Sequence, residues 1–420
     1  MTSGLSFLIA ARQCEIRELE QLMLTSELVQ RTGQFTHALQ RERGMSNLVL
    51  SSGGRRWTAE RAQQIAECRR LEAEARAAFD RLDIDGGRIG NGARLFSRIA
   101  YVLHGLESLP ALRQRIDTLD GITASEATQA FTRLVSGLLA VVFEAADSAS
   151  DPQVSRLLVA MFNFMQGKEF AGQERATGAA AFASGRSDAR RQQQWLHLID
   201  SQERCFQVFT DFAEAGPLAL WQACNAGRPL ADLERLRRIG CTAPEDGLLD
   251  PEASQGWFDS CSARIDAMQA VEARLATDLL ARCQSKIAQA RQDLQSQQSL
   301  LAALAGPAPA PGGFAVPPAD GFAVAPQSYG PHLERSVLEM VQEQSKRLQA
   351  MNDELTTVRA SLNERKLVER AKGLLMAHRQ LSEEEAHKML RQTAMSQNRR
   401  LVDVAEAVLA MADLLPGGAR

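Results

Sequence analysis

Residues 154–165 read VSRLLVAMFNFM, and this stretch decides the fold class. Its large apolar residues recur at the three- and four-residue spacings of one face of an α-helix. They are Val154, Leu157, Leu158, Met161, Phe162 and Met165. The pattern predicts a long helix that packs one apolar stripe against a core.

The composition extends this prediction to the whole chain. Aromatic residues make up 5% of the 420 residues, runs of Val, Ile, Thr and Tyr are scarce, and Ala, Leu, Gln, Arg and Glu dominate, as is typical of helices. The length suggests two or three folded units at about 150 residues each, and 45% apolar residues suffice for real cores. We expect an all-α protein whose residues 1–303 form helical bundles joined by short Gly- and Pro-containing loops.

Charge and cysteine usage narrow the functional classes. With 48 basic and 51 acidic residues the net charge is −3, so any contact with nucleic acid must come from a local basic patch. Seven cysteines without a C-x-x-C pair indicate a reducing compartment. No basic residue precedes the short apolar run at the N-terminus, and no stretch approaches the roughly 20 apolar residues of a membrane span. We expect a cytoplasmic protein without a membrane segment.

Motifs for catalysis or metal binding are missing from the sequence. It contains no G-x-x-x-x-G-K-[ST], H-E-x-x-H or G-x-S-x-G pattern, and its six histidines have no ligand spacing. The prediction is a non-enzymatic protein without catalytic residues, a metal site or a cofactor.

A change of composition divides the chain near residue 304. Residues 305–331 contain seven of the fourteen prolines, which remove helix hydrogen bonds. The prediction is a linker over residues 304–331, acting either as a flexible tether or, through its repeated GFAV tetrapeptide, as a segment that docks on a domain. We expect a coiled-coil helix at 332–364 and a small three-helix domain at 365–415.

The predicted helix at 332–364 carries the seam of a two-stranded coiled coil. The residues that alternate at spacings of four and three are Val337, Val341, Gln344, Leu348, Met351, Leu355, Val358 and Leu362. A seam of this kind indicates a homodimer. The alternative is a single helix that packs the same stripe on the N-terminal bundles, because about three and a half heptads are close to the lower limit for a coiled coil.

The N-terminal region repeats a short motif that contains an arginine. ERG at 42–44 is followed ten residues on by SG at 52–53, and ERA at 174–176 stands in the same register to SG at 184–185. Arg43 and Arg175 are at helical spacings from apolar residues, so both lie on apolar faces. A guanidinium in such a position needs an anionic partner, because desolvating an unpaired ion costs several kcal/mol.

Two kinds of partner satisfy these arginines. Each can form an ion pair within the chain, with Glu42, Glu169 or Glu174. Alternatively, Arg43 and Arg175 converge from the two halves and clamp a small planar oxyanion, whose geometry matches the fork of guanidinium donors. Such an anion would draw together two groups that otherwise repel, which is the physical basis of a switch.

The segments QRERGMSNLVLSSGG (40–54) and KEFAGQERATGAAAFASG (168–185) resemble the NIT domain, the nitrate- and nitrite-sensing domain of bacterial signalling proteins. The resemblance extends over the region 1–303. It implies two four-helix bundles with the anion held between them by arginines, and it makes Arg43 and Arg175 the first candidates for this contact. A third family arginine falls in DLERLRRIG (232–240), where Arg235 is the first choice and Arg237 the alternative. The other interpretation of Arg235 is a surface partner of Asp232 or Asp246.

The two repeats are not identical at the residue after the arginine. The second repeat has Ala176 where the first has Gly44. The two arms of the predicted anion site therefore need not bind equivalently.

The C-terminal region contains a local basic patch. Residues 365–400 carry nine basic and four acidic residues in a chain that is negative overall. Such a patch on a small helical module indicates a phosphate-binding surface. The alternative is a solvated charged face.

The run ERKLVERAKGLLMAHRQLSEEEAHKMLRQTAMSQNRRLVDVAEAVL (364–409) strongly resembles the ANTAR domain, a three-helix RNA-binding module of transcription antitermination. The resemblance implies a dimer that binds hairpins in nascent leader mRNA. The implied RNA-binding residues are Lys366, Arg370, Lys372, Arg391, Arg399 and Arg400. We expect nitrate or nitrite to release the dimeric C-terminal domain, which then prevents termination ahead of nitrate-assimilation genes. The alternative is an anion-sensing signalling scaffold whose C-terminal bundle binds a protein partner.

Overall fold

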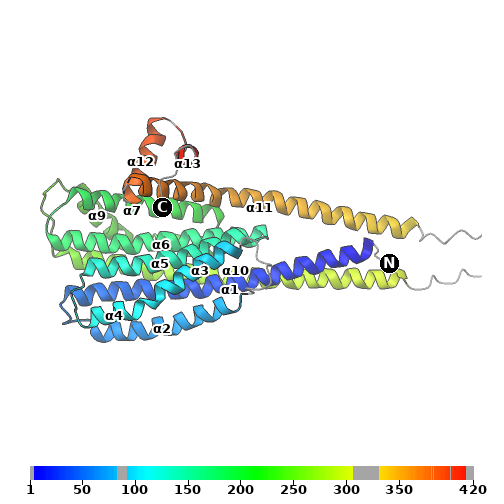
Figure 1. Cartoon of the computed structure of the whole chain (residues 1–420), viewed down its shortest axis with the longest axis horizontal. Coiled ribbons are helices and arrows are strands. Elements are labelled where there is room, and N and C mark those ends of the chain that lie inside the picture. The colour runs from blue at the N-terminus through cyan, green and yellow to red at the C-terminus, as the bar shows by residue number, and fades with distance from the viewer. Residues whose placement is uncertain are drawn as a thin grey trace, which may run out of the picture.

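The computed structural model describes residues 4–82, 92–226, 228–305, 331–379, 381, 383–397 and 399–412. These residues form helices and no β-strand, so the predicted all-α class is confirmed. In chain order the helices are α1 (Gly4–Ser51), α2 (Thr58–Asp80), α3 (Gly92–Glu107), α4 (Leu109–Asp117), α5 (Ala124–Ser148), α6 (Pro152–Ser184), α7 (Ala189–Phe212), α8 (Ala215–Cys224), α9 (Arg228–Thr242), α10 (Ala253–Ala305), α11 (Pro331–Arg379), α12 (Glu383–Ser396) and α13 (Leu401–Ala412). Most of them lie along the long axis of the molecule, whereas α12 and α13 stand off to one side (Figure 1).

The first half of the N-terminal region is a bundle of α1 to α5. Helix α1 packs along α2 and α5, and α3 packs on α5. Helices α3 and α4 follow one another with only Ser108 between them, and Pro110 lies in the first turn of α4. Because proline cannot donate the backbone hydrogen bond of a continuous helix, the chain breaks here. The two short helices therefore act as one broken helix in a four-helix bundle.

The second half repeats this plan with α6 to α10. Helix α6 packs on α7 and α10, and α8 and α9 supply the broken helix. The turns after α1 and α6 have the same chemistry: the hydroxyls of Ser52 and Ser184 each donate to a backbone carbonyl three residues earlier. The following residues, Gly53 and Gly185, have positive φ angles of 61° and 68°, which glycine adopts without steric cost. The repeated sequence motif thus belongs to a repeated helical unit.

Helix α6 lies at the centre of the molecule and joins the two halves. All six residues of its predicted apolar stripe are at most 3% exposed. One apolar cluster runs through α1, α2, α3, α5, α6, α7 and α10 without a break. Burial of one large apolar side chain contributes roughly 1.5–3 kcal/mol, so this shared core holds the two bundles together.

The C-terminal residues form a separate small unit at the end of α11. This end packs with α12 and α13 around Ala371, Leu375, Ala386 and Leu390. Helix α11 is continuous from Pro331 to Arg379, so the predicted boundary between coiled-coil helix and small domain falls inside one helix. The predicted linker lies almost wholly outside the described residues, and its GFAV repeats lie there entirely.

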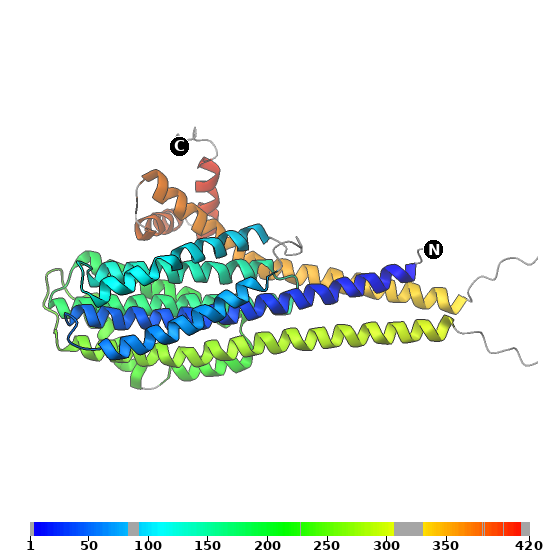
Figure 2. The ribbon, with the colours of Figure 1, turned by 60° about the horizontal axis from the view of Figure 1, so that its bottom comes forward.

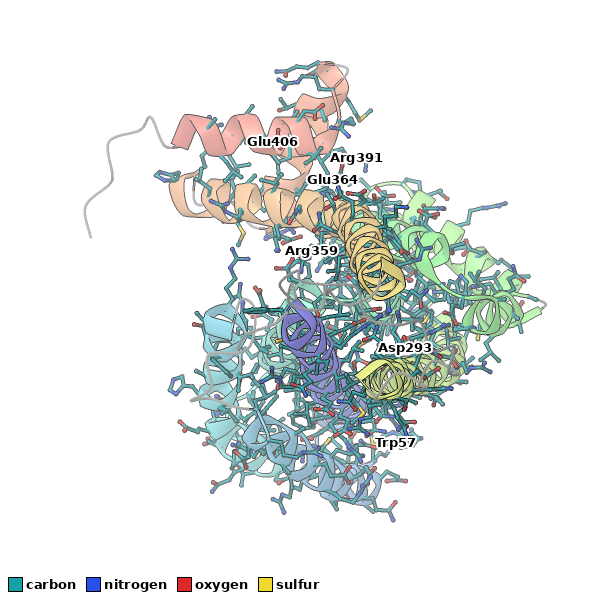
Figure 3. All side chains as sticks on the ribbon, turned by 90° about the vertical axis from the view of Figure 1, so that its right-hand side faces the viewer. Trp57, Asp293, Arg359, Glu364, Arg391 and Glu406 are labelled. Carbon is teal, nitrogen blue, oxygen red and sulfur yellow. The ribbon has the colours of Figure 1, made fainter. Side chains whose placement is uncertain are left out.

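The predicted coiled-coil seam faces the N-terminal bundle. Leu355 and Val358 are 8% and 1% exposed, and Val358 belongs to the large apolar cluster of that bundle. Leu348, nearer the start of α11, is 52% exposed. The side chains of four seam residues lie outside the described set: Val337, Val341, Gln344 and Leu362. Figures 2 and 3 show α11 lying along the outside of the bundle. This is the packing that the single-helix alternative describes, and the homodimer remains a prediction.

One helix in the described part of the chain, α5, has the length and apolar composition of a membrane span. The expectation that no stretch comes close to this length was therefore too strict. Helix α5 packs against α1, α3 and α6, and it buries the ionisable residues Glu144 and Asp147. These contacts are typical of the core helix of a bundle.

Candidate anion site and RNA-binding surface

Arg43 forms a buried ion pair that crosses from the first half to the second. Its side chain is 4% exposed. Nη1 and Nη2 donate to Oε1 and Oε2 of Glu169 on α6, at 2.6 and 3.1 Å. Nη1 also donates to the hydroxyl of Thr132 on α5, at 2.9 Å. Arg43 thus has one of the carboxylate partners that the sequence offered as the alternative to an anion, held in two-point geometry.

Arg175 has a different set of partners. Its Nη1 donates to the hydroxyl of Ser262 on α10 at 2.9 Å, and its guanidinium carbon lies 4.8 Å from the centre of the Phe258 ring. Among the described residues, no carboxylate forms an ion pair with Arg175. Burial, followed by the charge of Arg43, lowers the pKa of Arg175 to about 10. The group stays cationic at neutral pH without a matching anion.

Each of the two guanidinium groups lies at the interface between the halves, against a glycine of the opposite half. A β-carbon built on Gly44 of α1 would lie 2.9 Å from Nη2 of Arg175, and one on Gly172 of α6 would lie 2.7 Å from Nη2 of Arg43. Each arginine therefore reaches across to the opposite helix at a position that has no side chain. The predicted convergence of Arg43 and Arg175 is present in the geometry.

The glutamates that precede the two arginines bind arginines of their own half. Glu42 accepts from Nε and Nη2 of Arg113 on α4, both at 2.8 Å. Glu174 accepts from Nε and Nη2 of Arg237 on α9, at 2.7 and 2.6 Å. Both carboxylates are at most 1% exposed. The glutamate of each motif thus points toward the broken helix of its own bundle. The arginine points across the interface between the two bundles, which we call the seam.

The two candidates for a third arginine lie in different environments. Arg235 is exposed on α9. Arg237 is 9% exposed and bound to Glu174, the residue that precedes Arg175. Of the two, the structure brings only Arg237 into the charge network around the seam, and there it already has a carboxylate.

Two of the predicted RNA-binding residues contact the N-terminal half. Lys366 of α11 forms an ion pair with Asp147 of α5 at 2.5 Å and lies 5.8 Å from the centre of the Phe143 ring. Arg391 of α12 forms an ion pair with Asp200 of α7. These contacts bring two basic residues of the small C-terminal unit against acidic residues of the bundle.

The other predicted RNA-binding residues differ in accessibility. Arg370, Arg399 and Arg400 are exposed, and Arg400 forms an ion pair with Asp403 at 3.0 Å. Lys372 is 7% exposed, and its Nζ lies 2.9 Å from a carboxylate oxygen of Glu369, one turn earlier. With Arg391, whose side chain is 53% exposed in its ion pair, four of the six predicted residues are exposed in this structure.

Comparison with known proteins identifies both parts of the chain. Residues 34–280 match the family described as nitrate and nitrite sensing (NIT), and residues 356–409 match the ANTAR domain. The chain belongs to the NIT family and carries an ANTAR domain. The nitrate regulatory protein of Klebsiella oxytoca is 34% identical over 404 residues, covering 95% of this chain and 93% of that protein. The solved structure of the NasR transcription antiterminator is 32% identical, with a TM-score of 0.61, and the match covers 98% of this chain and 99% of that one. The predicted family and the predicted regulator type are confirmed.

Other residues of the NIT domain that line the seam were not predicted from the sequence. Thr132 and Ser262 each lie about two turns into the last helix of their half, and each binds the arginine of its own repeat. The signal that could have found them is the repeat itself, extended from the arginine motif to the last helix of each half. Arg113 of α4 could have been found in the same way, because it corresponds to Arg237 of α9 in the second half.

Arg264 of α10 is a further, partly buried cation of the NIT domain. Its Nη1 donates to Oε1 of Gln202 at 3.0 Å, and its guanidinium carbon lies 5.8 and 5.7 Å from the ring centres of Phe206 and Trp221. Burial lowers its pKa to about 10. No pattern in the sequence distinguishes this arginine from the exposed ones.

The part of the chain that the structure describes contains no group of three or more His, Cys, Asp or Glu side chains that could hold a metal ion. The matched families are regulatory, and the chain is assigned to a sensor and antiterminator class.

Proposed function

We propose that this protein is a nitrate- or nitrite-responsive transcription antiterminator. The anion binds between Arg43 and Arg175 of the NIT domain and releases the ANTAR domain. The released domain dimerises and binds hairpins in nascent leader mRNA, so that polymerase passes a terminator ahead of nitrate-assimilation genes. The K. oxytoca relative is named a nitrate regulatory protein, and the solved relative is a transcription antiterminator.

The observation that carries the proposal is the meeting of the buried guanidinium of Arg43 with the partly buried one of Arg175, of which, within the described ranges, only the first is paired with a carboxylate. Arg43 is paired with Glu169, whereas Arg175 is held by a hydroxyl and a ring. An anion about 4 Å from a guanidinium gains roughly 4 kcal/mol at an effective dielectric constant near 20, before desolvation. An anion bound between Arg43 and Arg175 therefore links α1 to α6 and changes how the two halves pack.

Contacts between the two domains support regulation by shielding. Arg365 of α11 donates to Oδ1 of Asn163 at 3.1 Å and lies 4.7 Å from the centre of the Phe162 ring, both on α6. Lys366 and Arg391 form ion pairs with acidic residues of the NIT domain. The Arg391 side chain in its ion pair is 53% exposed, and such a pair contributes only about 0–1 kcal/mol. The contact of Arg391 with α7 therefore opposes release only weakly.

Helix α7 connects the anion site to this docked surface. On one side, Gln202 donates to Glu174 at 2.6 Å, and Trp195 donates to the same carboxylate at 3.1 Å. On the other side, Asp200 binds Arg391, and the ring centres of His197 and His387 are 5.1 Å apart. We infer that a change at Glu174, next to Arg175, is transmitted to the ANTAR domain through α7.

Docking and dimerisation compete for the same residues. Val358 and Leu355 are buried in the docked arrangement, and both belong to the predicted coiled-coil seam. Two copies can pair along this seam only after α11 leaves the NIT domain. Release by the anion would therefore expose the dimerisation seam together with Lys366 and Arg391.

Calorimetric titration of the full chain with nitrate and nitrite tests the sensing step. The wild-type protein should give saturable heat, and Arg175→Ala, which removes the cation that has no carboxylate, should abolish it. Arg43→Ala should weaken binding as well. Heat that survives both substitutions in folded protein would exclude the arginine site.

Binding of leader RNA, measured with and without nitrate, tests the output step. Affinity should rise with nitrate and fall steeply with salt, because phosphate contacts release counterions. Combined Arg399→Ala and Arg400→Ala should abolish binding. RNA affinity that is insensitive to salt and to both substitutions would instead favour a protein-binding scaffold.

A further inference from the structure

We propose that Glu169 determines the charge of the anion that the NIT domain accepts. The proposal concerns the site of the proposed function and rests on it. Arg43, Arg175 and Glu169 together carry one net positive charge. This charge suits a monovalent oxyanion, such as nitrate or nitrite, and disfavours a divalent one, such as sulfate.

The carboxylate of Glu169 is buried in the site and accepts hydrogen bonds on both oxygens. It is 0% exposed. Besides the two hydrogen bonds from Arg43, Oε2 accepts from Gln40 at 2.9 Å and Oε1 accepts from Gln173 at 2.8 Å. Two donors on each oxygen match the acceptor-only chemistry of an ionised carboxylate. The negative charge is therefore fixed between the two halves.

The repeat supplies this carboxylate to only one arm. Glu169 lies six residues before Arg175, and the residue six before Arg43 is His37. Burial, followed by the charge of Lys168, whose Nζ lies 3.4 Å from Nδ1 of His37, lowers the pKa of that histidine to about 3. A neutral imidazole thus replaces the carboxylate in the first repeat. This difference between the halves leaves the seam with an unmatched cation.

The other buried ions nearby neutralise one another. The pairs are Lys168 with Glu272, Glu42 with Arg113, and Glu174 with Arg237. Among the residues that the structure describes, Arg264 also lacks a carboxylate partner, but it is held away from this group by Gln202 and by the rings of Phe206 and Trp221. At the two seam arginines, the surplus positive charge is therefore that of the group of Arg43, Arg175 and Glu169.

The charge of this group decides which anions fit. A monovalent anion makes the group neutral. A divalent anion leaves one net negative charge in a largely desolvated seam, where an uncompensated charge is costly. Neutralising Glu169 should therefore favour a divalent anion more than a monovalent one.

The test compares perchlorate with sulfate, which have the same tetrahedral shape and different charge, by calorimetric competition against nitrate on the full chain. In Glu169→Gln the affinity for sulfate relative to perchlorate should rise about tenfold or more, while nitrate binding is at least as tight as in the wild type. An unchanged ratio in a variant that still binds nitrate would overturn the proposal.

Two matched variants control for the substitution. Glu169→Asp keeps the charge and should keep the wild-type ratio. Glu144→Gln removes a buried carboxylate of α5 that is twelve residues, or about 18 Å of helix, from Thr132, and it should also leave the ratio unchanged. A shift of equal size in Glu144→Gln would contradict a local role of Glu169.

A wild-type measurement makes the proposal testable even where Glu169→Gln does not fold. Sulfate at a hundredfold excess should not displace nitrate from the wild-type protein, and displacement at equal concentrations would overturn the proposal. Absence of nitrate heat in the wild type would instead remove the proposed function, and the role of Glu169 with it.

Discussion

The guanidinium of Arg175 lies directly against Gly44, the residue that follows Arg43 in the chain. A β-carbon at position 44 would lie 2.9 Å from Nη2 of Arg175, which is closer than a β-carbon normally approaches another heavy atom. The second repeat has Ala176 at the corresponding position. The difference between the repeats, visible in the sequence, thus decides where the arginine of the opposite half can enter.

Gly44→Ala should therefore weaken nitrate binding without unfolding the protein. The added methyl group displaces the end of a flexible side chain, so we expect a loss of affinity of about tenfold, or about 1.4 kcal/mol. The fold should be unchanged or more stable, because alanine is favoured over glycine in helices by about 0.8–1 kcal/mol. Calorimetry and thermal unfolding measure the two effects. Gly256→Ala is the matched control, because a β-carbon there meets no atom within 4 Å. Full affinity in Gly44→Ala would contradict the close approach.

Substitution of Arg237 should lower stability strongly, whereas substitution of Arg235 should leave it almost unchanged. Arg237→Ala leaves the buried carboxylate of Glu174 without its two-point partner, which should cost about 3–5 kcal/mol. Arg235 is exposed, and Arg235→Ala should change the free energy of unfolding by less than about 0.5 kcal/mol. Urea denaturation measures both values.

Nitrate titration of Arg235→Ala decides whether Arg235 is the third anion contact. Its exposure predicts unchanged affinity. A clear loss of affinity at unchanged stability would show that α9 brings this residue to the anion.

The stability of the protein should fall on acidification below about pH 6.5, partly because of His37. The pKa of His37 is lowered from 6.5 to about 3 by burial and by Lys168. Between these two values the unfolded chain binds a proton at this residue and the folded chain does not. The free energy of unfolding therefore decreases as the pH falls through this window, by up to about 1.4 kcal/mol per pH unit for one proton.

His37→Gln tests this assignment, because it removes the titrating group from both states. Urea denaturation at pH 7.5 and pH 5.5 should give a smaller loss of stability on acidification in this variant than in the wild type. An equal loss in both proteins would assign the pH dependence to other groups.

The sequence predicts the helices and the two seam arginines because both depend on local spacing. The apolar stripe of residues 154–165 and the repeated motif are short-range patterns, and the structure has them as expected. The sequence did not decide the partner of Arg43, since Glu42, Glu169 and Glu174 were all candidates. The choice depends on how α1 crosses α6, which brings Glu169 to Arg43 and turns the other two toward α4 and α9.

The sequence also did not decide which surface covers the apolar stripe of α11. Leu355 and Val358 form an apolar seam whichever surface covers it. The sequence pattern records the stripe, but it does not record whether the NIT domain or a second copy lies against it. Docking on the bundle depends on specific contacts between distant residues, such as Lys366 with Asp147, which no local pattern contains.

Gln202→Ala should separate nitrate binding from the RNA response. Gln202 is 2% exposed and contacts Glu174, Arg237 and Arg264; it forms no hydrogen bond with Arg43 or Arg175 in the part of the chain that the structure describes. We expect nitrate affinity to stay within about threefold of the wild type, while the nitrate-dependent gain in RNA affinity is largely lost. Coupling between two sites is typically worth 1–3 kcal/mol, or about 5–150-fold, so the loss is measurable by RNA binding at fixed salt. Gln207→Ala, at an exposed position of α7 whose side chain donates to Asp211, should respond as the wild type does. A full nitrate response in Gln202→Ala would mean that the signal reaches the ANTAR domain directly along α6, through Asn163 and Arg365.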